Sequence, residues 1–161
     1  MALTAVNPIV LSTPSPQGLP LDQMLAEDAK TWKKGEFALL TSGTVTPLVA
    51  TGSTAVYAIF ASDQTSSTST STVYIRRLIP GTILAISEMN AGTPGLASAA
   101  TIGTAYGARG LSNVSYLDVG TATGQFRVIG PASTHKAYQD AFEDMDATPG
   151  LVIVEFRGFV S

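Results

Sequence analysis

Few residues of this chain have side chains that could carry out catalysis. His135 is the only histidine and the chain has no cysteine, which excludes disulfides and cysteine-ligated zinc. The Gly-x-Ser-x-Gly motif of a serine-hydrolase nucleophile is absent, as are the glycine-rich motifs that cradle phosphates. His135 stands next to Lys136 at the start of an expected helix, and we interpret it as a polar surface residue. We therefore expect a protein that is not an enzyme and that holds no cofactor or metal.

The carboxylates form two candidate groups. Asp140 and Asp144 are four residues apart, so on a helix they would share a face and could bind calcium weakly. The spacing of a calcium loop is absent, and we favour a solvated helix face. Asp118 and Glu155 lie on expected strands and could act as the carboxylate pair of a glycosidase, although the sequence does not place them opposite each other. Glu155 and Arg157 are two residues apart on one strand, and this spacing predicts an ion pair between them.

The composition favours a protein that associates with other subunits. Of the 161 residues, 45% are hydrophobic and 13% are charged, against about 25% charged in an average domain. Small polar residues and apolar atoms must then cover the surface, which suits subunit contacts. The net charge of −3 argues against nucleic acid, which needs clustered Lys and Arg. No apolar run approaches the ~18 residues of a membrane span, and the N-terminus lacks the basic region of a signal peptide. We expect a soluble protein made in a cytoplasm, with no membrane partner.

The first 20 residues are predicted to form an extended N-terminal arm. Its four prolines remove backbone donors and exclude a helix or a central strand. Several apolar side chains would be wasted on a mobile tail, so the arm is expected to lie on a neighbour and to add backbone hydrogen bonds to a sheet edge. A disordered terminus is the alternative. The residues expected to contact the partner are Leu3, Val6, Ile9, Val10 and Leu11.

Residues 21–161 are predicted to form a single β-rich domain, an all-β barrel or sandwich of jelly-roll-like type with one or two short helices. About eight short strands at regular spacing support this class. Helices are expected at 21–32, with Trp32 holding its end on the core, and at 135–147. The expected strand segments are 35–50 with a turn at Ser42-Gly43, 54–61, 72–87 broken at Pro80-Gly81, a hairpin of 114–119 and 125–130, and 151–160.

A polar segment separates two of these strands. Nine of the eleven residues 62–72 are Ser or Thr. These residues offer no apolar surface to bury, so we expect a mobile loop that faces outward or becomes ordered against a partner.

Two stretches of the chain resemble small head-decoration (cement) proteins of tailed bacteriophages. The first is "AEDAKTWKKGEFALLTSGTVTPLVATGSTAVYAIFAS", with its Lys-Gly-Glu strand start, its Gly-x-Val turn and its Val-Tyr-Ala-Ile-Phe-Ala end. The second is "IGTAYGARGLSNVSYLDVGTATGQFRVIG", with an Ile-Gly-x-x-Tyr-Gly element followed by Tyr-Leu-Asp-Val. The likeness spans residues 27–130, with these two stretches near its ends.

The resemblance implies a structural virion protein on the capsid exterior. Proteins of this family bind the outer surface of the mature head, often as homotrimers at threefold or quasi-threefold positions, and cement neighbouring subunits of the major capsid protein. Two alternatives remain open at this point. One is another virion subunit of the tail, baseplate or fibre, and the other is a carbohydrate-binding β module.

Overall fold

The computed structural model describes residues 7–49, 53, 55–68, 70–90, 93–94, 100–121, 123–131 and 151–158. Within these residues the chain is all-β, as the sequence predicts. The described part contains no helix, and its strands are β1 (Ile9–Ser12), β2 (Leu21–Ala26), β3 (Phe37–Thr41), β4 (Thr44–Pro47), β5 (Val56–Phe60), β6 (Thr72–Arg77), β7 (Ile83–Asn90), β8 (Thr93–Pro94), β9 (Ala105–Leu111), β10 (Val114–Asp118), β11 (Phe126–Pro131) and β12 (Leu151–Phe156).

The first half of the chain forms a closed barrel. Its strands are hydrogen-bonded in the order β2-β4-β3-β5-β6, and β6 pairs back onto β2 over five residues. Closure leaves no free strand edge on this barrel. Its interior is apolar and packs around Trp32, whose ring stacks on Phe60 with centroids 4.2 Å apart. The other members of this core are Ala26, Ala38, Val45, Ala58, Val73 and Ile75.

The second half of the chain, joined by the N-terminal strand β1, forms a seven-stranded sheet that also returns on itself. Its order is β1-β7-β10-β9-β11-β12, and β12 pairs with β7 again. Strands β7, β10, β9, β11 and β12 are therefore hydrogen-bonded in a ring, called the second ring below. β10 runs parallel to β7, while the β9–β10, β9–β11, β11–β12 and β12–β7 pairs are antiparallel.

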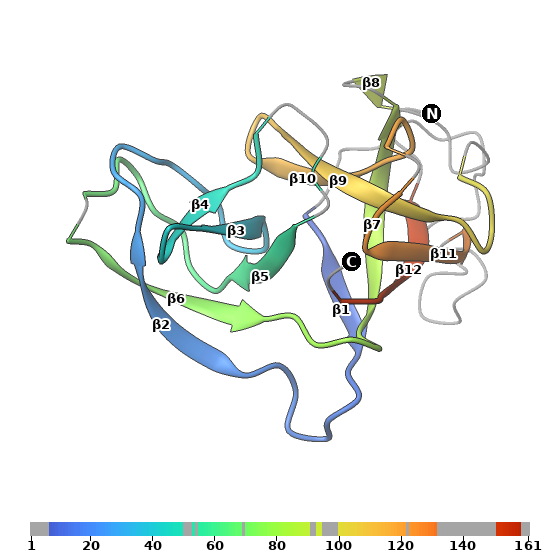
Figure 1. Cartoon of the computed structure of the whole chain (residues 1–161), viewed down its shortest axis with the longest axis horizontal. Helices are drawn as coiled ribbons and strands as arrows, with labels where there is room; N and C mark the ends of the chain where they lie inside the picture. Colours follow the sequence, from blue (N-terminus) through green and yellow to red (C-terminus); the bar gives the residue numbers. More distant parts are fainter. Residues whose placement is uncertain are drawn as a thin grey trace.

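The barrel and the second ring lie side by side (Figure 1) and share one large core. Phe37 of the barrel stacks on Phe126 of the second ring at 4.9 Å, and Phe126 contacts Phe156 at 5.5 Å. Buried polar groups also join the two halves. The side-chain amide of Gln125 accepts from the Val56 N–H and donates to the Val56 carbonyl, at 2.6 and 3.0 Å. These two bonds give the buried N–H and carbonyl of Val56 hydrogen-bond partners away from water.

The helix predicted over 21–32 is wrong. Leu21–Ala26 is a strand, paired with β6 from Leu21↔Arg76 to Leu25↔Thr72. The apolar spacing of Leu21, Met24 and Leu25 fits a helical face, but pairing with a strand fifty residues away in sequence overrides that local preference. The structure places Trp32 in the barrel core, 1% exposed, as predicted. The second predicted helix, 135–147, lies outside the described residues.

The hairpin predicted between 114–119 and 125–130 is also wrong. β9 lies between β10 and β11, so these two strands do not pair with each other. β10 instead forms a hairpin with β9 through Ser112-Asn113, both at positive φ (50° and 61°). The turn predicted at Ser42-Gly43 is confirmed, with φ of 48° and 84°. Two successive residues at positive φ match the twist of a two-residue hairpin.

The Ser/Thr-rich segment is a loop, as expected, but it is held on the end of the barrel rather than extending into solvent. Gln64 and Trp32 exchange two backbone hydrogen bonds of 3.0 Å. Ser67 is 2% exposed, and its hydroxyl donates to the Glu27 carbonyl and accepts from the Lys30 N–H. Serine hydroxyls can satisfy backbone groups in this way, so polar side chains order this loop without apolar burial.

Candidate interaction surfaces

The described residues contain neither a candidate metal-binding cluster nor a helix suited to crossing a membrane. Within them, no group of three or more His, Cys, Asp or Glu side chains lies close enough to hold a metal ion. No helix of the described part is long and apolar enough to cross a membrane. His135, Asp140 and Asp144 lie outside the described residues, so their predicted surface roles stay predictions.

The two strand carboxylates singled out in the sequence are each held by a different arginine. Asp118 is fully buried, and its Oδ2 accepts from Arg109 Nε at 3.0 Å and from the Thr121 hydroxyl at 3.0 Å. Glu155 accepts from Arg127 at 2.9 Å. Each carboxylate is therefore paired with its own arginine. This arrangement gives no support to a glycosidase pair.

The ion pair predicted between Glu155 and Arg157 is wrong. Glu155 lies directly opposite Arg127 in the antiparallel β11–β12 pair, which brings their side chains together across the ladder. Opposite residues on antiparallel strands are closer than residues two apart on one strand. Cross-strand register, which the sequence alone does not specify, therefore decides the partner.

Glu88 is the unusual ionisable group of the second ring. It lies on β7 opposite Leu117 of β10 and is 0% exposed. Neither of its carboxyl oxygens has a hydrogen-bond partner among the described residues. Strand alternation places its side chain on the same face as the buried Leu84 and Ile86. Burial raises the pKa of Glu88 from 4.5 to about 7, which keeps the carboxyl largely protonated in mildly acidic solution.

The predicted arm residues divide into three groups. Ile9 and Val10 are 36% and 37% exposed on β1, and Leu11 packs against a small cluster around Ala85. Leu3 and Val6 lie outside the described residues. β1 pairs with β7 of the same chain, so this part of the arm extends the chain's own sheet.

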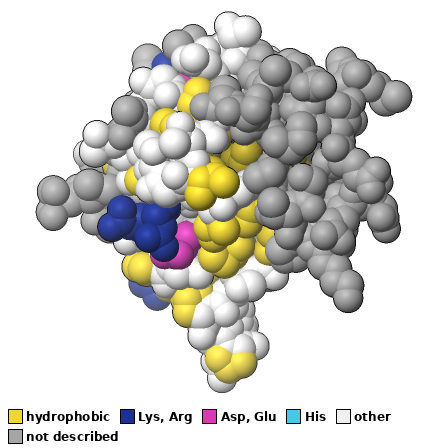
Figure 2. All heavy atoms as spheres, turned by 90° about the vertical axis from the view of Figure 1, so that its right-hand side faces the viewer, with side chains coloured by type: hydrophobic (Ala, Val, Ile, Leu, Met, Phe, Trp, Pro, Cys, Tyr) yellow, Lys and Arg dark blue, Asp and Glu magenta, His cyan; other side chains and the backbone are white. Residues whose placement is uncertain are grey.

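Figure 2 views the molecule from the side of the second ring and shows hydrophobic side chains gathered beside basic ones.

A second exposed apolar surface lies on the outside of the barrel. On β2 and β6 the residues alternate between the core and solvent. The outward residues include Leu21 (53% exposed), Leu25 (48%) and Tyr74 (49%). We call this surface the β2–β6 face, and its remaining members are the exposed Gln23, Thr72 and Arg76.

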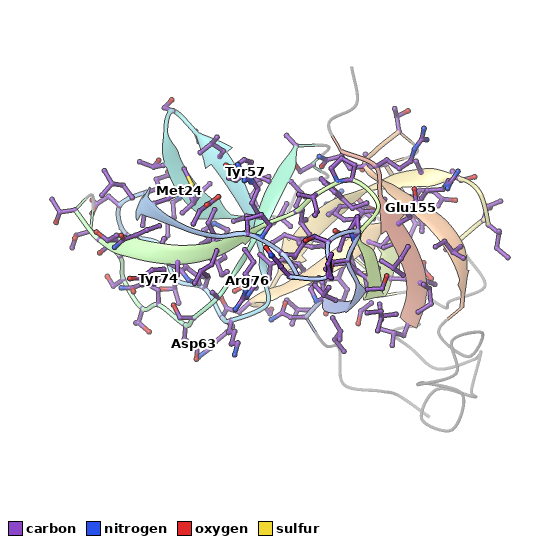
Figure 3. All side chains as sticks on the ribbon, turned by 90° about the horizontal axis from the view of Figure 1, so that it is seen from below. Met24, Tyr57, Asp63, Tyr74, Arg76 and Glu155 are labelled. Atoms are coloured by element: carbon purple, nitrogen blue, oxygen red, sulfur yellow. The ribbon has the colours of Figure 1, made fainter. Side chains whose placement is uncertain are left out.

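The residues of the β2–β6 face form directly opposed pairs. Gln23 lies opposite Tyr74, and Leu21 lies opposite Arg76. Tyr74 and Arg76, two residues apart, lie on the same side of β6, far from Glu155 of the second ring (Figure 3). The neighbouring Arg77 is paired with Asp22 at 3.6 Å. The face therefore combines apolar side chains with a cationic one, a composition typical of protein interfaces.

Sequence reasoning missed the β2–β6 face because the helix prediction assigned Leu21 and Leu25 to a buried helical side. The sequence Leu-Asp-Gln-Met-Leu-Ala shows no apolar–polar alternation, and the alternating exposure of Leu21–Ala26 appears only in the folded strand. Pairing of β2 with β6 then places three cross-strand pairs on one outward face: Leu21–Arg76, Gln23–Tyr74 and Leu25–Thr72.

The comparisons with known proteins give no relative. No family model matches the chain, and no curated protein or solved structure matches it.

Proposed function

We propose that this protein is a structural virion protein that binds the outer surface of a phage head. It would cement neighbouring subunits of the major capsid protein, as a homotrimer at threefold or quasi-threefold positions. The observation that carries the proposal is the β2–β6 face, on which Leu21, Leu25 and Tyr74 are each about half exposed. The resemblance of residues 27–130 to head-decoration proteins gives this surface its proposed partner.

The closed barrel favours recognition through side chains. Its strands leave no edge for strand addition, so a partner that binds the wall of the barrel does so through outward side chains such as those of β2 and β6. Tyrosine and arginine are the residue types most often found to dominate binding energy at interfaces, and Tyr74 and Arg76 lie two residues apart here. A decoration protein present in many copies also gains avidity from modest individual contacts.

The exposed aromatic content disfavours the carbohydrate-binding alternative. Sugar-binding surfaces rely on aromatic rings, and Tyr74 is the only exposed aromatic side chain in the described part of the chain. Trp32, the residue best suited to stack on a sugar, is buried in the barrel.

The number of copies in purified particles tests the proposal. Quantitative mass spectrometry against the major capsid protein should give a ratio near one to one, or a simple lattice fraction of it. A few to a few tens of copies would instead place the protein in the tail or at a vertex. Absence from the particle would contradict both virion roles.

The surface itself is tested by binding to expanded capsids that lack this protein. Tyr74→Ala should weaken binding by about 2 kcal/mol, roughly thirtyfold, if Tyr74 is a central contact. Ile102→Ala is the matched control, because Ile102 is 66% exposed in a turn before β9, away from the barrel. Equal affinity of the two variants, measured by cosedimentation, would remove the β2–β6 face from the proposal.

A further inference from the structure

A cavity of about 280 Å³ opens between the barrel and the β9–β10 hairpin. On the barrel side it is lined by Thr31, Glu36, Pro47 and Leu48, and on the hairpin side by residues 110–113. It lies apart from the β2–β6 face and contains none of the residues of that surface. Small-molecule pockets usually measure about 300–1,000 Å³, so the size of this cavity suits one side chain or a small ligand rather than a cofactor.

The carboxyl group of Glu36 is the charged group of this cavity. Glu36 is 3% exposed, and its Oε2 accepts a hydrogen bond from the Lys33 N–H. Within the described residues its Oε1 accepts no hydrogen bond, and unlike the two carboxyl oxygens of Glu88 it is not fully enclosed. One oxygen of a nearly buried carboxylate is therefore open to the cavity that Glu36 lines.

The surroundings of Glu36 favour a cation in the cavity. Burial raises the pKa of the Glu36 carboxyl above its usual value, and the negative charge of Asp63 raises it further, against the hydrogen bond and the charge of Lys33. Asp63 is itself held by the Lys34 N–H at 2.7 Å. A bound cation would relieve both the desolvation of Glu36 and its repulsion from Asp63.

The rest of the lining suits an aliphatic stem that ends in several donors. Pro47, Leu48 and Leu111 supply apolar surface, along which the methylene groups of a lysine-like chain can pack. Thr31 and Ser112 each carry a hydroxyl oxygen. That of Thr31 already accepts from the Ser66 N–H at 3.2 Å, and a hydroxyl oxygen has a second lone pair that can accept another hydrogen bond. An ammonium group has three donors, which matches one carboxylate oxygen and two hydroxyl oxygens.

We propose that this cavity binds a primary ammonium group on an aliphatic stem, with Glu36 as its counter-ion. A guanidinium group fits less well, because its fork binds best to both oxygens of a carboxylate, and the Lys33 N–H already occupies Oε2 of Glu36. The proposal does not depend on the virion role and applies to the isolated protein.

The test is an NMR titration of the full-length protein with n-butylammonium. Backbone amide signals of residues 110–113 and of Glu36 should shift in a saturable way, and n-butanol, which has the same stem but no charge, should leave them unchanged. Binding should weaken as the pH falls and Glu36 becomes protonated. Signals that do not move with n-butylammonium, or that move equally with n-butanol, would overturn the proposal.

Glu36→Gln provides the matched variant. Its side-chain carbonyl can still accept from the Lys33 N–H, so the loop is preserved while the charge is lost. Affinity for n-butylammonium should fall about tenfold or more, because the ammonium group then donates to a neutral amide oxygen instead of a charged carboxylate oxygen. Unchanged affinity in this variant, with an unchanged spectrum elsewhere, would contradict the role of Glu36.

Two probes separate the sources of such a group. One is a short peptide with a central lysine, compared with the same peptide carrying acetyl-lysine, and the other is free 1,5-diaminopentane. Tighter binding of the lysine peptide would support a lysine side chain of a partner protein, and tighter binding of the diamine would support a free amine. Failure of both probes would overturn the proposal even if the protein is found on the virion.

Discussion

The barrel and the second ring differ in what their interiors contain. The barrel core is a small apolar cluster around Trp32 and Phe60, three of whose other members are alanines. The interior row of β7 in the second ring runs from Leu84 and Ile86 to Glu88, an ionisable group without a hydrogen-bond partner in the described residues. The Trp32 cluster of the barrel therefore contains only apolar residues, while the interior of the second ring carries a group whose free energy depends on pH.

The largest expected effect is on the barrel. Trp32→Ala removes a ring that is 1% exposed, stacks on Phe60 and donates its Nε1–H to the Ser62 carbonyl at 3.0 Å. The free energy of unfolding should fall by about 3–5 kcal/mol. Tyr74→Ala, on the exposed outside of the same barrel, should change it by no more than about 0.5 kcal/mol. Urea denaturation of both variants would measure the difference, and similar losses would contradict the assignment of Trp32 to the core.

The features of the barrel that the sequence predicted are the local ones. Strand 56–60 and the turn at Ser42-Gly43 follow from apolar runs and turn residues that lie next to each other in the chain. The break at Pro80-Gly81 separates β6 from β7 for the same reason. Such signals depend on a few adjacent residues, and no distant contact is needed to read them.

The errors all involve pairing between distant segments. Leu21–Ala26 becomes a strand because β6 pairs with it, and β9 enters between β10 and β11. Glu155 takes its partner from β11 rather than from its own strand. The burial of Glu88 and Glu36 depends on packing by other elements, so no sequence pattern marks them as candidates.

The second prediction concerns the pH dependence of the second ring. The pKa of Glu88 is about 7 when folded and 4.5 when unfolded, so the folded state holds its proton more tightly. The stability that Glu88 contributes is fully present below pH 4.5 and is lost as the pH rises to about 7. The loss from this group is about 3 kcal/mol.

Replacing Glu88 with Gln should remove this dependence. Relative to Glu88→Gln, the wild type should lose stability in thermal melting as the pH rises from 4.5 to about 7, because only the wild type carries this component. Glu155→Gln, which alters a partly exposed carboxyl, is the control and should behave like the wild type. If the wild type and Glu88→Gln lose stability in parallel, then Glu88 is not the source of the pH dependence.

The smallest expected effect is that of breaking an exposed ion pair of the second ring, and a buried ion pair of the same ring provides the contrast. Arg127 and Glu155 are paired at 2.9 Å with side chains 45% and 29% exposed, whereas Arg109 and Asp118 are paired at 3.0 Å with side chains 18% and 0% exposed. Arg127→Ala should cost at most about 1 kcal/mol, because water screens an exposed pair. Arg109→Ala should cost about 3–5 kcal/mol, because it leaves the buried charge of Asp118 without its arginine. Urea denaturation at low and high salt would separate the two, since only the exposed pair should weaken appreciably with salt. Equal costs for the two variants would contradict the argument that burial governs how much each ion pair contributes to stability.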